Sequence, residues 1–169
     1  MNKLVYMIFL GFFLLSEAKE PTLGILKKVN SNTKQLFTIS NSTFVCESYA
    51  VIGIEKLANS KNLETPCRDN INKFYKKNPT AKYYSQSLLY VMQRYHIEFK
   101  RDECLLFASG EIVLSEILLR EGLAVLKPGF KDEEYKGVFK IAQKNAKIEE
   151  KGVWKDSIVR DCIAEIYKE

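Results

Sequence analysis

The chain has 169 residues, of which 46% are hydrophobic and 28% are charged, a balance typical of an ordinary globular domain. This composition excludes a collagen, a coiled-coil rod and a long disordered tail, and the length allows one domain or two very small ones. The 26 Lys and Arg residues exceed the 21 Asp and Glu residues and give a net charge of +5, which permits an anionic partner without identifying one.

Residues 1–18 have the pattern of a secretory signal peptide. Lys3 supplies the positive start, an apolar run covers residues 4–15, and residues 16–18 place small side chains at the two positions that a signal peptidase reads. The run is shorter than the roughly 20 residues that span a bilayer, and no second apolar stretch of that length follows. We therefore expect residues 19–169 to form an exported domain, secreted or periplasmic, without a membrane span.

Export changes what the cysteines indicate. All four lie after residue 18, and an even number of cysteines in an oxidising compartment predicts two disulfide bonds, with three possible pairings left open. Their spacing is too wide and irregular for a zinc site, and no histidine lies near them. The candidates are Cys46, Cys67, Cys104 and Cys162.

Segments rich in β-branched and aromatic residues predict the strands. The turn signal at residues 30–32 separates the first two segments and indicates a β-hairpin, and residues 41–42 mark another turn before a longer third strand. The predicted strands are residues 23–29, 35–39, 44–54, 97–99 and 104–107, and residues 123–126 are expected to be extended.

Four later segments carry the apolar spacing of three and four residues that is typical of a helix. Thr65-Pro66 marks the start of the first helix, and Gly122 lies at a natural end of the third. The predicted helices lie between residues 65 and 78, 81 and 95, 114 and 121, and 132 and 152, with residues 55–64 as a loop. This order predicts a small α+β domain built on a short-stranded barrel.

The chain has none of the short motifs that bind nucleotide cofactors or mark common hydrolases. Its one histidine, His96, lies at the edge of a predicted strand with no acid or cysteine constellation beside it. A nucleotide cofactor is therefore not implied, and a mechanism that needs two histidines is excluded.

The C-terminal third contains a distinctive pattern of small and aromatic residues. It reads L-L-R-E-G-L-A over residues 118–124 and continues with Ala142, Ala146-Lys147 and Gly152-Val153-Trp154. This pattern resembles the staphylococcal nuclease (thermonuclease) family, although Ser115 stands where that family usually has Asn. Residues 23–54 are similar to the family's opening strands. The resemblance implies a five-stranded OB-type β-barrel, with about three to four helices in this disulfide-containing α+β chain.

The resemblance also implies an activity. Enzymes of the family hydrolyse DNA and RNA with calcium, using two aspartates on the metal, a glutamate that assists the attacking water and two arginines on the phosphate. Calcium prefers carboxylate oxygens, and guanidinium groups match the charge that develops on the phosphate oxygens. Calcium is thus the expected cofactor, and DNA or RNA the expected partner.

Two of the family's site positions have a direct counterpart in this chain. The D-G-D-T turn of the family falls on residues 30–33 and places Asn32 at a metal-binding aspartate. Asn can ligate calcium through its carbonyl oxygen, but it adds no negative charge. Arg101 matches the arginine that opens the family's G-R-x-L-A strand, although the loop that usually precedes it is missing.

The second metal acid has two possible registers on the family's R-L-x-G-I-D-T-P-E segment. The first makes Glu55 the acid and is preferred because it keeps a continuous strand, whereas the second places Glu64 there and keeps Thr65-Pro66. Both registers lose the arginine and the glutamate of that segment. Their replacements are Ala50 and Ala58 in the first register and Asn59 and Cys67 in the second.

Two functions follow from these residues. The first is an exported calcium-assisted nuclease in which Arg101, Glu55 and Glu64 are the catalytic candidates and Asn32 and Glu55 the metal candidates. The second is a catalytically degenerate OB-fold module that binds nucleic acid, or an envelope protein or glycan, without cleavage. A stripe of lysines on the last helix is either a solvated face or a face that contacts phosphates; it comprises Lys136, Lys140, Lys144 and Lys147.

Overall fold

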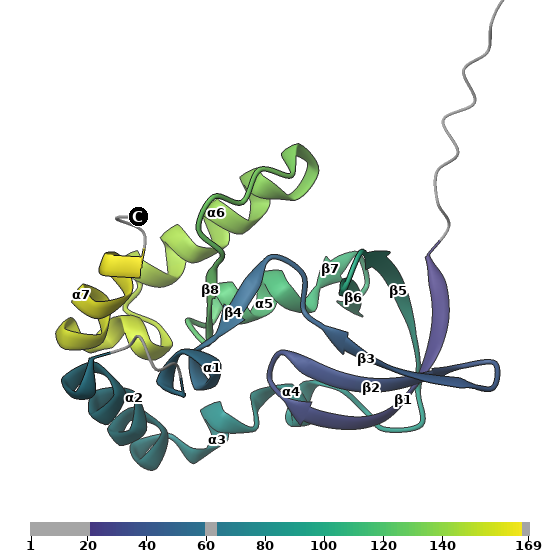
Figure 1. Cartoon of the computed structure of the whole chain (residues 1–169), viewed down its shortest axis with the longest axis horizontal. Coiled ribbons are helices and arrows are strands. Elements are labelled where there is room, and N and C mark those ends of the chain that lie inside the picture. Colours follow the sequence, from purple (N-terminus) through teal and green to yellow (C-terminus); the bar gives the residue numbers. More distant parts are fainter. Residues whose placement is uncertain (1–20, 60–63, 167–169) are drawn as a thin grey trace, which may run out of the picture.

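The computed structural model describes residues 21–59 and 64–166, so the predicted signal peptide lies outside the described residues. It is a mixed α+β structure with an antiparallel sheet on one side and a group of helices on the other. Figure 1 shows the hairpin strands at the right, helices α2 and α7 at the left, and the short pair β4 and β8 in the middle with α5 beside it.

The main sheet has six strands in the order β3-β2-β1-β5-β6-β7, and all neighbours are antiparallel. The predicted hairpin is confirmed, because β1 and β2 pair on either side of the turn at residues 32–33. A second sheet pairs β4 with β8. The strands are β1 (Thr22–Ser31), β2 (Lys34–Ile39), β3 (Ser42–Glu47), β4 (Val51–Gly53), β5 (Arg94–Lys100), β6 (Glu103–Ser109), β7 (Ile112–Val113) and β8 (Ala124–Leu126).

The main sheet is not closed into a barrel, so the predicted five-stranded barrel needs correction. The chain just after β3 approaches β6 where one parallel bridge joins Ser48 to Cys104, beside a disulfide between Cys46 and Cys104 with Cα atoms 5.6 Å apart. Pairing stops there because the predicted long strand 44–54 bends. Ala50 takes a φ of 64°, in the left-handed region, and the chain leaves β3 to form β4.

Within the described residues there are seven α-helices and one 3-10 helix, more than the three to four predicted. The segment expected as a loop after residue 54 begins with α1, and the expected helix 81–95 ends early. Tyr95, which the spacing had placed in that helix, lies in β5 opposite Gly24 and is part of the sheet. The helices are α1 (Ile54–Ala58), α2 (Thr65–Lys77), α3 (Pro79–Lys82), α4 (Tyr84–Leu88), α5 (Leu114–Arg120), α6 (Glu133–Ile148), the 3-10 helix η1 (Gly152–Lys155) and α7 (Ser157–Ile166).

Two hydrophobic clusters hold the described residues together. The sheet core lies between the main sheet, α5 and α6, and includes Leu26, Phe37, Ile97, Leu106, Leu118 and Phe139. The helical core includes Ile54, Ile71, Val125, Trp154, Val159 and Ile163. A second disulfide, Cys67–Cys162, joins α2 to α7 beside the helical core. None of the helices in the described ranges is long and apolar enough to cross a membrane.

Candidate functional site

A hollow of about 820 Å³ lies where the β5–β6 turn meets the bend before β4 and the loop between β8 and α6. We call it the Arg101 hollow. The turn is tight, because only Arg101 and Asp102 separate the two strands, and Arg101 adopts a φ of 58°. The resemblance had pointed to Arg101, and the structure places it at the rim of this hollow.

Four acids line the Arg101 hollow, and two of them, Glu47 and Glu103, are paired with lysines, whereas Asp102 has no ion pair among the described residues. Glu47 on β3 accepts ion pairs from Lys56 at 2.7 Å and from Lys34 at 3.4 Å. Burial opposes ionisation of Glu47, but the two lysines outweigh it and hold the pKa of this carboxyl below its usual value. Glu103 pairs with Lys127 and also accepts the backbone N–H of Ala50 at 3.2 Å.

Two aromatic rings form part of the lining. The Tyr49 ring meets the Phe130 ring edge to face, with centroids 5.5 Å apart, and the Tyr49 hydroxyl donates to Asp132 at 2.8 Å. Burial and this hydrogen bond raise the pKa of Tyr49 to about 12. Burial alone would raise the pKa of Asp132, but its donors, which include the N–H groups of Glu134 and Tyr135, lower it below the usual value.

Two cations of the Arg101 hollow have no acid partner. In the described part of the chain, no carboxylate lies within ion-pair distance of Arg101 or Lys131, although both side chains are exposed. Lys100, by contrast, pairs with Glu98 at 2.7 Å, and that hydrogen bond raises the pKa of Lys100. Arg101 and Lys131 therefore present the charges that an anionic ligand could neutralise.

Asn32, the first metal candidate, lies in the β1–β2 turn and is only 1% exposed. Its amide oxygen accepts the backbone N–H of Ser85 at 3.0 Å, and its amide nitrogen donates to the carbonyl of Ala81 at 2.8 Å. The Asn32 side chain thus ties the hairpin turn to α3 and α4. One oxygen lone pair is already engaged in that tie.

Glu55, the other metal candidate, lies in α1 and lines a separate hollow of about 410 Å³ with Tyr75 and Lys76. The Tyr75 hydroxyl donates to one Glu55 oxygen at 3.3 Å, whereas the other oxygen is buried without a hydrogen-bond partner. Burial first and the charge of Glu55 second raise the pKa of Tyr75 above its usual value. A Cβ on Gly53 would lie 3.2 Å from the Glu55 carboxyl carbon and 3.0 Å from Thr33, so the hairpin turn does lie beside Glu55.

The remaining predicted site residues lie elsewhere. Glu64 is exposed immediately before α2 and lines none of the hollows described here. Lys136 pairs with Glu133 at 3.3 Å, and Lys140 and Lys144 are exposed on α6. Lys147 lies 4.6 Å from the Trp154 ring centroid, so one member of the lysine stripe packs on the protein itself.

The structure therefore separates the predicted catalytic residues. Arg101 lines one hollow and Glu55 another, and within residues 21–59 and 64–166 no three acids, histidines or cysteines form a group that could hold a metal ion. Lys56 and Tyr49, which do line the Arg101 hollow, were not among the predicted site residues. Their positions depend on the bend at residues 48–50, which the strand pattern did not reveal.

No protein-family model and no curated protein matches this chain. The resemblance to the thermonuclease family thus rests on the sequence motifs alone.

Proposed function

We propose that this protein is an exported, thermonuclease-like OB module that binds nucleic acid in the Arg101 hollow without cleaving it. The observation that carries the proposal is the charge state of the hollow. Among the residues that the structure describes, Arg101 and Lys131 have no ion-pair partner, whereas Glu47 and Glu103 are paired with lysines. Unpaired cations beside the Tyr49 and Phe130 rings are the combination that single-stranded nucleic acid requires, with phosphates on the cations and bases against the rings.

The order of the strands supports an OB-type origin. The pairing β3-β2-β1-β5-β6 together with the parallel bridge from Ser48 to Cys104 brings the two ends of a five-strand unit towards each other. OB folds bind oligonucleotides on their strand face and in the adjoining loops. The two disulfides support export, because such bonds persist in oxidising compartments.

The residues present do not fit a calcium cage. Calcium takes six to eight oxygen ligands, whereas Asn32 is buried with its oxygen engaged and Glu55 offers one carboxylate beside it. The positions of the family's glutamate and second arginine carry other residues in both registers. The proposal therefore does not include cleavage with calcium, which is tested by incubation of the same DNA with calcium.

The experiment measures binding of a fluorescein-labelled single-stranded DNA by polarisation, using the purified, oxidised protein between 50 and 200 mM salt. Each phosphate contact contributes about 0.7 to the slope of log affinity against log salt for single strands. We expect Arg101→Ala to weaken binding about 10-fold and to reduce that slope by about 0.7. Arg94→Ala is the matched control, since Arg94 is exposed at the far end of β5, the strand that leads into the Arg101 turn.

Three results would overturn the proposal. Equal affinity of wild type and Arg101→Ala would place any bound DNA elsewhere, and absence of binding would direct attention to an envelope protein or glycan. The same DNA incubated with calcium or with chelator reports cleavage. Calcium-dependent cleavage that is lost in Glu55→Gln would make the protein the nuclease that the resemblance implies.

A further inference from the structure

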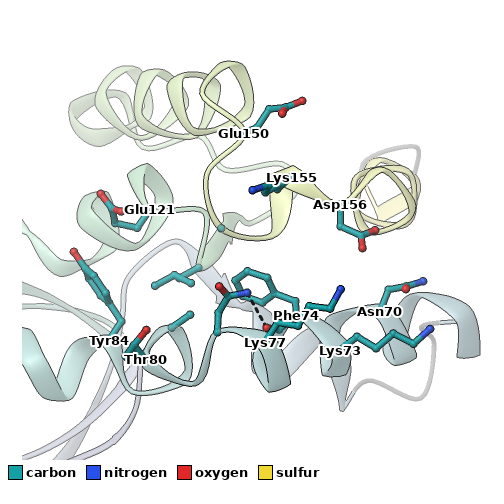
Figure 2. A pocket seen from close by; sticks show the side chains of 14 residues that line it. Asn70, Lys73, Phe74, Lys77, Thr80, Tyr84, Glu121, Glu150, Lys155 and Asp156 are labelled. Atoms are coloured by element: carbon teal, nitrogen blue, oxygen red, sulfur yellow. Dashed lines mark hydrogen bonds between the residues drawn. The ribbon is translucent and has the colours of Figure 1, made fainter.

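A second pocket, of about 660 Å³, lies between α2 and the segment that joins α6 to α7. We call it the Phe74 pocket. Figure 2 shows Lys73 and Lys77 on the α2 side, Lys155 on the opposite side and the Phe74 ring between them. It shares no lining residue with the Arg101 hollow, and its volume falls in the range of about 300–1,000 Å³ typical of small-molecule sites.

The wall opposite α2 is built by close backbone packing. Gly122 and Gly152 have φ values of 63° and 54°, and a Cβ on Gly122 would lie only 2.3 Å from the carbonyl oxygen of Lys151. A Cβ on Gly152 would lie 2.4 Å from the carbonyl oxygens of Glu121 and Gly122. Only glycine permits this contact, which fixes the corner after α5 against η1. The corner that places Glu121 and Gly152 in the pocket wall is thus held by backbone contacts.

The acids that line the Phe74 pocket interact with residues outside its lining. Glu121 pairs with Lys151 at 3.6 Å, and Glu150 pairs with Arg160 at 3.3 Å. Asp156 accepts the backbone N–H of Val159 at 3.1 Å in the first turn of α7. None of these acids pairs with a lysine of the pocket.

The positive charges of the pocket lysines are not neutralised by ion pairs within the described residues. Among the described residues, no carboxylate lies within ion-pair distance of Lys73, Lys77 or Lys155, and all three are exposed. Lys73 and Lys77 come from α2, and Lys155 comes from η1 on the opposite side of the pocket (Figure 2). Tyr84 adds a hydroxyl at one end of the pocket, and burial raises the pKa of Tyr84, which keeps that hydroxyl a donor.

We propose that the Phe74 pocket binds a small phosphorylated ligand with a planar ring, for which a nucleoside monophosphate is the simplest probe. The phosphate would lie between Lys73, Lys77 and Lys155, and the ring would pack against the half-buried Phe74. This site is independent of nucleic-acid binding in the Arg101 hollow, because different residues form it.

The test is calorimetric titration of the purified, oxidised protein with AMP, adenosine and inorganic phosphate. We expect AMP to bind at least about 10-fold more tightly than either part alone, since the pocket offers both a cationic and an aromatic contact. The variant Lys73→Ala/Lys155→Ala should lose at least about 10-fold in AMP affinity, whereas Lys140→Ala/Lys144→Ala removes two exposed lysines outside the pocket and should retain it.

Three results would overturn the assignment. Equal affinity for AMP and inorganic phosphate would show that the pocket does not recognise the ring. Equal loss of AMP affinity in the two lysine double variants would show that net charge, rather than the pocket lysines, controls binding. Loss of AMP binding in Arg101→Ala, with Lys73→Ala/Lys155→Ala unchanged, would move the ligand to the Arg101 hollow. Retained AMP binding in Arg101→Ala would separate this site from the proposed function.

Discussion

Removal of the Cys46–Cys104 disulfide should cost stability and also disturb the Arg101 hollow. The two cysteines are 58 residues apart, and the loop-closure model gives a stabilisation of about 4 kcal/mol for a closed loop of that length. The Cys67–Cys162 disulfide, with a separation of 95, gives about 4.7 kcal/mol in the same model. We therefore expect a similar loss of unfolding free energy in the two double variants, Cys46→Ala/Cys104→Ala and Cys67→Ala/Cys162→Ala.

The two disulfides differ in what they position. Cys104 lies in β6 three residues after Arg101, and its carbonyl accepts the N–H of Tyr49 at 3.0 Å, so the first disulfide holds β3 against the turn that carries Arg101. The second disulfide joins α2 to α7 in the other half of the structure. We expect both double variants to lose unfolding free energy, but only Cys46→Ala/Cys104→Ala to lose affinity for single-stranded DNA.

Urea unfolding followed by Trp154 fluorescence gives the stabilities, and polarisation gives the DNA affinities under conditions where each variant is folded. Domains of this kind have stabilities of about 5–15 kcal/mol, so a loss of about 4 kcal/mol leaves a measurable folded population. A loss below about 1 kcal/mol for both variants would refute the loop-closure reasoning. Equal DNA affinity in the two double variants would refute the positional role of Cys46–Cys104.

Three further predictions concern single residues. Glu47→Gln should raise DNA affinity about threefold in polarisation, because it releases Lys56 and Lys34 from their ion pairs; unchanged affinity would count against a cationic site. Tyr49→Phe removes the hydrogen bond to Asp132 and should lower stability below pH 10. Because burial and that hydrogen bond raise the pKa of Tyr49 to about 12, wild type should lose its advantage over the variant as the pH rises from 10 to 12, as thermal unfolding across pH will show. Gly122→Ala should lower the free energy of unfolding in urea by at least about 2 kcal/mol, because a backbone clash adds to the left-handed φ. Gly110→Ala, with a φ of 58° and open space around it, should cost about 1 kcal/mol. Equal losses would contradict the packing of Gly122 against Lys151.

Local signals in the sequence predicted several elements correctly. The hairpin followed from its turn residues, Thr65-Pro66 does begin α2, and Asp132 caps α6 by accepting the N–H groups of Glu134 and Tyr135. These features depend on interactions between residues close together in the chain, so the local sequence is enough to predict them.

The errors arise where distant contacts override the local pattern. Residues 44–54 read as one strand, but β4 turns away to pair with β8, and this pairing depends on residues more than 70 positions later. Helix α7 was not predicted, although Val159 and Ile163 have helical spacing, because its place is set by packing on α2 and by Cys67–Cys162. The cysteine pairing could not be chosen for the same reason.

The chemistry of the Arg101 hollow depends on the direction of one short helix. Consecutive residues on a helix point about 100° apart, so Glu55 and Lys56 at the start of α1 diverge. Glu55 turns to the hollow that contains Tyr75, whereas Lys56 turns to the Arg101 hollow and neutralises Glu47. The carboxylate that the resemblance assigns to catalysis thus lies in a different hollow from Arg101, and this separation favours retention of an anionic chain over its cleavage.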